Sequence, residues 1–311
     1  MSNFVLRPAP LVVFPGALGD FICLLPALGA LEARASRRPT LFCKGDLVAL
    51  ANAAAVADAR PIEDRRTSWL FSAHPPEEAD RFFGAFASID SFTGAAVPEV
   101  MRNLSRWQGA NGRAHAFRPA EAMHLAVHFL RALDPGAPCD IPSEVRLSLD
   151  ARACDQRFAP FAAVRPLLVV HPGSGGRVKR WSRAGFAEVA RRWRDRCGAV
   201  FVVLGPAERD EASFWQKDFV VADDVDLVTA ASLLARCDAY LGNDSGMSHL
   251  AAAAGARGVA LFGPSDPQCW RPLSARIESI RLDPWIECDR AASHDAVDRV
   301  ARALDDAAES P

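Results

Sequence analysis

The sequence has no hydrophobic run long enough to cross a membrane. Its longest apolar stretch near the amino end, residues 21–31, contains Pro26 and is shorter than the ~20 residues that a spanning helix needs. No basic leader with a cleavage site precedes that stretch. We therefore expect a cytoplasmic protein, with any membrane contact limited to the periphery.

Closely spaced metal ligands and a strong net charge are also missing. The eight cysteines form no C-x-x-C pair and no compact group with histidine, which predicts free thiols and no metal site. The formal net charge is -2, so no global positive charge attracts a polyanion. We expect no nucleic-acid partner.

Two familiar phosphate-binding motifs are absent as well. The glycines at 173 and 175 do not complete G-x-G-x-x-G, because residue 178 is Val. No G-x-x-x-x-G-K-[ST] segment occurs anywhere in the chain. A simple dehydrogenase or a P-loop enzyme is therefore disfavoured.

The patterns that are present indicate an α/β protein. In 311 residues, half of them hydrophobic, short apolar runs alternate with helical patterns, as in parallel α/β layers. A proline-rich stretch over 134–166 suggests a linker. We predict domains over 1–155 and 156–290, followed by a helix within 291–311 that Ser293 caps. The six expected strands are residues 11–14, 40–43, 167–170, 200–204, 239–241 and 259–262.

Glycine-rich loops follow four of these strands, and ligands of parallel sheets bind at the carboxyl ends of strands. In the first, Asp20 either caps the following helix or offers a carboxylate to a ligand, and the sequence alone does not distinguish these two roles. The second, His171 to Trp181, combines small residues with three cations, which suits a diphosphate. The third, 242–249, leads into a helix whose start favours phosphate, although Asp244 could be only its cap. The fourth is the turn at 263–267.

Taken in order, four segments resemble glycosyltransferase family 9, the ADP-heptose:lipopolysaccharide heptosyltransferases. They are F-P-G-A-L-G-D-F at 14–21, H-P-G-S-G-G-R-V-K-R-W-S at 171–182, L-G-N-D-S-G-M-S-H-L-A-A-A at 241–253 and A-L-F-G-P-S-D-P at 260–267. The resemblance implies the GT-B architecture, two Rossmann-like domains facing an interdomain cleft, with the acceptor bound by the domain over 1–155 and the nucleotide-sugar by the domain over 156–290. It also implies that the terminal helix packs back on the amino-terminal domain.

The resemblance further implies an inverting, metal-independent transfer of heptose from ADP-heptose to a lipopolysaccharide core or related glycan, with no cofactor and with peripheral contact at the inner membrane. Asp20 would be the general base. The donor-binding residues would be Ser174, Lys179, Glu208, Asp244, Ser245, Gly246 and His249. The D-x-D string at 223–226 would cap a helix and would not bind metal.

The predicted acceptor-binding site is a basic stretch in a region without a clear family match. Arg102, Arg106 and Arg113 lie in a segment without acidic residues, which predicts binding of a phosphorylated or carboxylated glycolipid. Three alternatives stay open: a transferase for another nucleotide-sugar, a nucleotide-sugar epimerase, and a non-catalytic nucleotide-sugar-binding protein.

Overall fold

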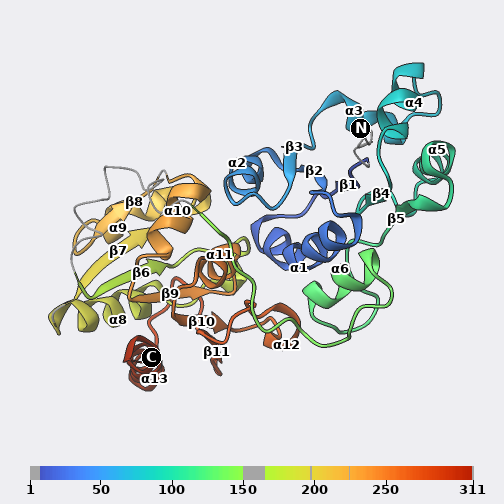
Figure 1. Cartoon of the computed structure of the whole chain (residues 1–311). Helices are drawn as coiled ribbons and strands as arrows, with labels where there is room; N and C mark the ends of the chain where they lie inside the picture. The colour runs from blue at the N-terminus through green and yellow to red at the C-terminus, as the bar shows by residue number, and fades with distance from the viewer. Residues whose placement is uncertain (1–7, 150–164, 197, 224, 310–311) are drawn as a thin grey trace, which may run out of the picture. The chain divides into compact units, whose positions relative to one another are not determined.

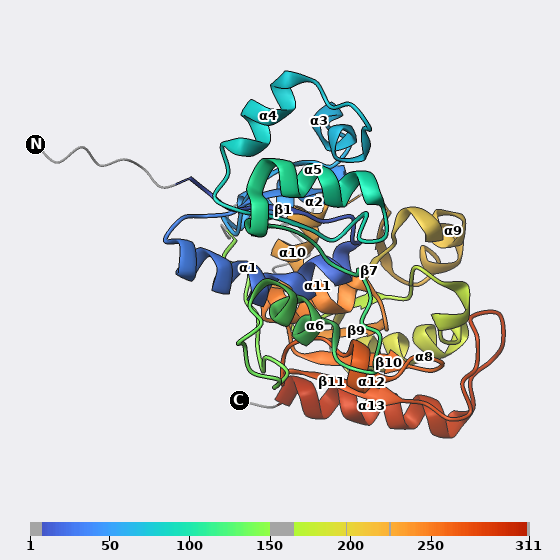
Figure 2. The same ribbon diagram turned by 90° about the vertical axis from the view of Figure 1, so that its right-hand side faces the viewer.

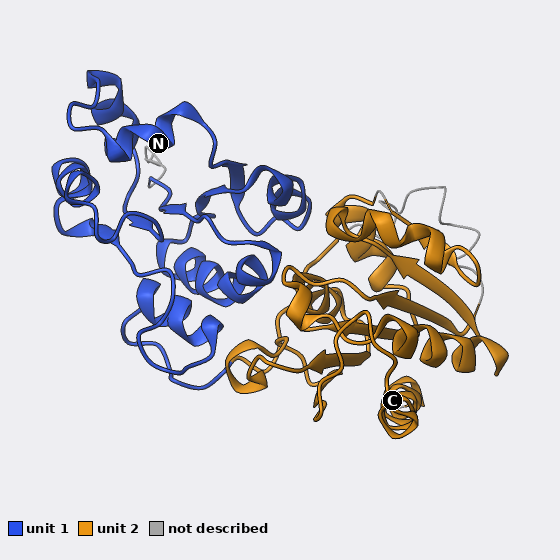
Figure 3. Cartoon of the chain, turned by 180° about the vertical axis from the view of Figure 1, so that it is seen from behind, with its two compact units in different colours: residues 1–141 blue, residues 142–311 orange. Residues whose placement is uncertain are grey.

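Two parallel β-sheets, each in its own compact unit, organise the chain in the computed structural model. Unit 1 comprises residues 1–141 and unit 2 residues 142–311 (Figure 3). The structure describes residues 8–149, 165–196, 198–223 and 225–309. The predicted boundary at 155/156 lies outside these residues, as do Cys154, Cys197 and Asp224 of the D-x-D string.

The sheet of unit 1 has the strand order β3-β2-β1-β4-β5, and all of its strand pairs are parallel (Figure 1). Its central strand is fully buried, and helices α1 and α6 pack side by side. The strands are β1 (Leu11–Val13), β2 (Thr40–Cys43), β3 (Asp58–Pro61), β4 (Ile89–Ser91) and β5 (Gly112–Ala114). The helices are α1 (Leu18–Ala35), α2 (Gly45–Ala53), α3 (Arg65–Ser68), α4 (Glu77–Gly84), α5 (Pro98–Gln108) and α6 (Leu125–Leu133), with 3₁₀ turns at Trp69–Phe71 and Gly109–Asn111.

The sheet of unit 2 has the order β11-β10-β9-β6-β7-β8 and is likewise parallel. Its strands are β6 (Leu167–His171), β7 (Ala199–Val203), β8 (Val220–Ala222), β9 (Ala239–Asn243), β10 (Gly258–Phe262) and β11 (Ile277–Arg281). Its helices are α8 (Arg183–Asp195), α9 (Ala212–Trp215), α10 (Leu227–Leu234), α11 (Gly246–Ala254), α12 (Pro267–Trp270) and α13 (His294–Glu309), with 3₁₀ turns η4 (Arg177–Lys179) and η5 (Pro206–Glu211). The predicted α/β fold class and the six predicted strands are confirmed.

The last helix, α13, begins as predicted: the Ser293 hydroxyl accepts a hydrogen bond from the N–H of Ala296 at 3.2 Å. Its apolar face lies in the core of unit 2, against α8 and strands β9 to β11 (Figure 2). This differs from the prediction that the helix packs on the amino-terminal domain. The reason is that the four predicted apolar positions are all buried within unit 2: Val297, Val300, Ala301 and Leu304.

Candidate functional site

The loops that follow β6 and β9 meet at the carboxyl edge of the unit 2 sheet. The two strands are paired in register, with Val170 opposite Leu241 and His171 opposite Gly242, so both chains leave the sheet at the same place. The Ser174 hydroxyl donates to the carbonyl of Asp244 at 2.8 Å. The fold therefore brings together two segments that lie 70 residues apart in sequence.

Lys179 and Asp244 form an ion pair at this junction, with 2.7 Å between Nζ and Oδ2. The same carboxylate oxygen accepts a hydrogen bond from the Ser265 hydroxyl at 2.5 Å, so the loop after β10 joins the cluster. The Asp244 side chain is 8% exposed, whereas Lys179 is 36% exposed. The nearly buried Asp244 carboxylate thus holds the ammonium group on one side, and the Lys179 side chain remains accessible to a ligand.

The start of helix α11 supplies further hydrogen-bond donors beside this pair. Ser245 occupies the N-cap position but makes no side-chain cap, so the first N–H groups, at Gly246 and Met247, have no capping acceptor there. The Ser245 hydroxyl, which the sequence analysis placed among the donor-binding groups, is instead buried beside the Tyr240 phenol and forms no well-shaped hydrogen bond within the described part of the chain. Free N–H groups at a helix start and an ammonium group are donors that a phosphate group prefers.

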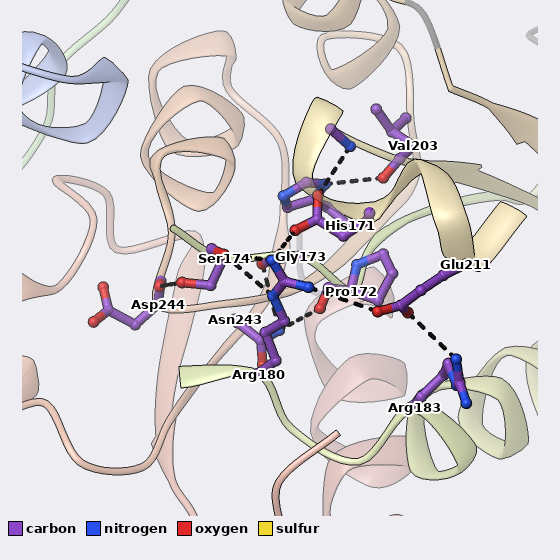
Figure 4. Close-up of polar contacts among 12 residues, drawn as sticks. His171, Pro172, Gly173, Ser174, Arg180, Arg183, Val203, Glu211, Asn243 and Asp244 are labelled. Carbon is purple, nitrogen blue, oxygen red and sulfur yellow. Dashed lines mark hydrogen bonds and ion pairs between the residues drawn. The ribbon is translucent and has the colours of Figure 1, made fainter. Parts of the chain in front are cut away.

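Arg180 holds the loop after β6 in place through hydrogen bonds and ion pairs. Its guanidinium donates from Nε and Nη2 to the carbonyl of Ser174, both at 3.2 Å, and pairs with Glu208 at 2.7 Å and with Glu211 at 3.6 Å (Figure 4). The Arg180 side chain is 10% exposed. A buried guanidinium with several acceptors fixes the shape of the loop that carries Ser174.

Glu208 is part of this support, and its carboxylate is 4% exposed. One oxygen pairs with Arg180 and the other accepts the N–H of Gly205 at 3.1 Å. The carboxylate also lies so close to Gly173 that a Cβ there would come within 2.5 Å of it. This placement differs from the sequence prediction that Glu208 contacts the donor directly, since its carboxylate is enclosed by Arg180, Gly205 and Gly173.

Asn243 and His171 complete the network, and the sequence analysis assigned no role to either. The Asn243 amide donates to the carbonyl of Pro172 at 2.7 Å and accepts from the N–H of Trp181 at 3.0 Å, clamping both ends of the loop. His171 donates from Nδ1 to the carbonyl of Val203 at 2.9 Å, and burial lowers the pKa of its imidazole. Both residues stand inside the matched segments, which was the available signal. His249, predicted to contact the donor, is buried in α11.

In unit 1, Asp20 lies in the first turn of α1 and has two partners. Its Oδ2 accepts the N–H of Ala17 at 3.0 Å, so the carboxylate does cap its helix. Its Oδ1 pairs with Arg118 at 2.8 Å. The Asp20 side chain is 14% exposed. The structure therefore shows the capping role that the sequence left open, and it adds an arginine contact that the sequence did not indicate.

The three arginines predicted to hold an acceptor each have an acidic partner in unit 1. Arg102 pairs with Glu99 and Arg106 with Asp80, and both guanidinium groups are about half exposed. Arg113 pairs at 2.9 Å with Asp90, whose carboxylate is fully buried and also contacts His115 at 2.8 Å. Asp90 and Asp80 lie outside the basic stretch, which is why the stretch looked unpaired in the sequence.

Neither a metal cluster nor a membrane span is found among residues 8–149, 165–196, 198–223 and 225–309. No group of three or more His, Cys, Asp or Glu side chains there could hold a metal ion. No described helix is both long and apolar enough to cross a bilayer. Asp226 of the D-x-D string caps α10, accepting the N–H groups of Val228 and Thr229, as predicted.

Each unit is a Rossmann-like parallel sheet with helices, and the loops of unit 2 place hydrogen-bond donors that suit an anion at the carboxyl edge of its sheet. This combination defines a two-domain nucleotide-binding class of fold. The model of glycosyltransferase family 9 (heptosyltransferase) matches residues 114–296. Because this match covers more than half of the chain, the chain belongs to that family. The family prediction made from the four segments is confirmed.

Individual relatives agree over a shorter region. Lipopolysaccharide heptosyltransferase 2 of Escherichia coli K12 is 36% identical over 131 residues, which are 38% of this chain and 37% of that protein. Lipooligosaccharide heptosyltransferase 2 of Haemophilus influenzae is 34% identical over 128 residues, with the same coverage. The chain thus matches little more than a third of the length of these relatives.

Solved structures match over nearly the whole chain. A family 9 glycosyltransferase from Veillonella parvula superposes with a TM-score of 0.76, 18% identity and coverage of 97% of this chain and 98% of that one. E. coli ADP-heptose lps heptosyltransferase II gives 0.70, 20% identity and coverage of 96% and 98%. These likenesses confirm the fold.

Proposed function

We propose that the protein is an inverting glycosyltransferase that moves heptose from ADP-heptose to a hydroxyl of a lipopolysaccharide core or related glycan. The observation that carries the proposal is the convergence of Lys179 and the start of α11 at the β6–β9 edge in a family 9 chain. The names of the relatives support the same transferred sugar and acceptor, since they are lipopolysaccharide and lipooligosaccharide heptosyltransferases.

Transfer in a single displacement needs a base, an aligned acceptor and a stabilised leaving group. The acceptor oxygen bonds to the anomeric carbon while the bond from that carbon to the phosphate oxygen breaks, and ADP leaves with the electron pair. Lys179 and the N–H groups of Gly246 and Met247 take up the charge of the diphosphate. Asp20 takes the proton of the acceptor hydroxyl.

Ser174, Asp244, Glu208 and His249 have supporting roles in this proposal. Asp244 holds the Lys179 ammonium, and the Ser174 hydroxyl ties the β6 loop to the backbone of Asp244. Glu208 acts through Arg180 as a positioning residue, because its carboxylate is enclosed. His249 lies in the helix whose start receives the phosphates. A glycolipid acceptor would bring the protein to the surface of the inner membrane without insertion.

The direct test is transfer with defined substrates. We expect the protein to release ADP from ADP-heptose only when a core oligosaccharide lacking that heptose is present, with the sugar added in inverted configuration. A thermal-shift comparison of ADP-, UDP- and GDP-sugars selects the donor, since ligand at 100 times its Kd stabilises the fold by about 2.7 kcal/mol. Binding without transfer to any acceptor would favour the nucleotide-sugar-binding alternative. Interconversion of free ADP-heptose epimers would favour the epimerase.

A further inference from the structure

The loop after β10 meets the Lys179–Asp244 pair through two half-buried side chains, Ser265 and Trp270. Asp244 is fixed beside this loop, because its N–H donates to the carbonyl of Leu261 in β10 at 2.8 Å. The Ser265 hydroxyl donates to Asp244 Oδ2 at 2.5 Å, and Lys179 Nζ lies 5.8 Å from the centre of the Trp270 ring. The ammonium group thus has a carboxylate and an aromatic face as neighbours, and the loop after β10 contacts the first and supplies the second.

The short helix α12 fixes the place of the Trp270 ring. Asp266 caps this helix by accepting the N–H of Gln268 at 2.9 Å, and the N–H of Trp270 donates to the carbonyl of Asp266 at 3.1 Å. Pro267 occupies the first turn, where its restricted φ suits a helix start. Ser265 directly precedes the cap, so one turn of the chain places both the hydroxyl and the ring.

Asp244 Oδ2 accepts two hydrogen bonds, one from the charged Lys179 and one from the neutral Ser265. When the ammonium turns its N–H groups toward a phosphate, this nearly buried carboxylate has to share its charged partner, which is unfavourable for a buried charge. The Ser265 hydroxyl remains as a donor to the same oxygen. It therefore lowers the free-energy cost of moving the lysine from the carboxylate to a ligand.

The Trp270 ring acts on the ammonium group in a different way. Attraction between a cation and an aromatic face reaches about 6 Å from the ring centre and is strongest for Trp. It arises from the charge distribution of the ring, so it persists while Nζ exchanges one hydrogen-bond acceptor for another. Because lysine carries its charge on a flexible stem, a fixed ring limits the positions that the Lys179 ammonium takes.

We propose that Ser265 and Trp270 are positioning residues for Lys179, with Ser265 compensating the Asp244 carboxylate and Trp270 confining the ammonium group. The inference rests on the proposed function, in which Lys179 binds the diphosphate of the donor. It makes the loop after β10, which the sequence identified only as a turn, a working part of that site. Both residues act through the lysine, so their effects should disappear when the lysine is absent.

A double-mutant cycle, measured by calorimetry with ADP on the full chain, tests this dependence. Ser265→Ala should weaken ADP binding about 3- to 10-fold, as for one lost hydrogen bond. Trp270→Leu should weaken it about 3-fold, as for one lost contact between a cation and an aromatic ring. In the Lys179→Ala background, each of these substitutions should change ADP affinity by less than about twofold.

Conservative variants separate positioning from a purely structural role. Ser265→Thr keeps the hydroxyl and should bind ADP within about twofold of the unaltered protein. Trp270→Phe keeps an aromatic face and should lose less affinity than Trp270→Leu. Ser213→Ala, at an exposed serine of α9, is the matched control and should bind normally. Thermal melts check that each variant is folded.

Normal ADP affinity in the folded Ser265→Ala and Trp270→Leu variants would overturn the proposal. Losses that persist undiminished in the Lys179→Ala background would also overturn it, because the two residues would then act independently of the lysine. Failure of the proposed function looks different. The cycle with ADP would still show the expected coupling, while no transfer from ADP-heptose to any acceptor would be measured.

Discussion

The carboxyl edge of the unit 2 sheet and the basic stretch of unit 1 both contain several cations in the sequence, but in the fold these cations have different surroundings. In unit 2, Lys179 lies beside a bare helix start and is paired with an acid of a neighbouring loop. In unit 1, Arg102, Arg106 and Arg113 are each paired with a different acid. Loops after paired parallel strands converge at one edge of a sheet, whereas the acids that pair with the three arginines lie in three different elements, α5, α4 and β4. The predictions below test this contrast, beginning with the largest effect.

The largest effect is expected at Asp20, in the first turn of α1. Asp20→Asn should lower the rate of single-turnover transfer by about 10²–10⁴, the usual contribution of a positioned general base. The fold should survive, because the side-chain oxygen of Asn can still accept the N–H of Ala17, as Asp20 does at the third position of α1. Rapid-quench transfer measures the rate, a thermal melt checks the fold, and ADP titration checks the donor site. A variant that transfers at the normal rate would leave Asp20 as a cap held by Arg118.

Lys179→Ala should weaken ADP binding by about 1.5–3 kcal/mol, the range for a hydrogen bond to a charged group. Removal of the ammonium also leaves the Asp244 carboxylate unneutralised near the incoming phosphates. Calorimetry with ADP measures the change. Lys217→Ala, an exposed lysine of the same unit, serves as the control and should bind normally. Normal ADP affinity in the folded Lys179 variant would move the phosphate site elsewhere.

The buried imidazole beneath the β6 loop should make stability sensitive to mild acid. Burial lowers the pKa of His171 in the folded protein, so below its unfolded value of about 6.5 the unfolded chain binds a proton that the folded chain resists. The free energy of unfolding should then fall by up to about 1.4 kcal/mol per pH unit. Urea melts between pH 7.5 and 5.5 measure this slope.

His171→Asn keeps a donor for the carbonyl of Val203 and should flatten that pH dependence. His74→Asn, at an exposed histidine of unit 1, should leave the slope as it was. An identical slope in the His171 variant would assign the acid sensitivity to other groups.

The smallest effect is expected for Arg102→Gln with Arg106→Gln. Their half-exposed ion pairs contribute about 0–1 kcal/mol each, so stability should barely change. If these arginines bind the acceptor as the sequence predicted, the acceptor KM should rise a few-fold while ADP affinity stays constant. A fall in ADP affinity with unchanged acceptor kinetics would reverse the assignment of substrates to the two units.

The sequence predicted those parts of the fold that carry apolar runs. Strands such as β1 and β10 are hydrophobic segments, whereas β4 and β5 contain Asp90 and Arg113, a half-buried ion pair whose charged residues hide the strand pattern. Contacts between remote segments were equally invisible. The enclosure of Glu208 by Arg180, and of α13 by α8, depends on packing that no local pattern encodes.

For the candidate site, the sequence predicted which loops take part and the structure supplied how they join. Ser174, Lys179 and Asp244 were all predicted and do lie together. Asn243 and His171 were missed, because their roles depend on contacts with the backbone of Pro172, Trp181 and Val203. These contacts form only when the strands are paired in the folded sheet.

The central claim is that the β6–β9 edge of unit 2 binds the diphosphate of the donor, and a crystal structure of the full chain with ADP tests it most directly. The account predicts phosphate oxygens within hydrogen-bonding distance of Lys179 Nζ and of the N–H groups at Gly246 and Met247. Phosphates bound at any other place, with the start of α11 left to solvent, would contradict it.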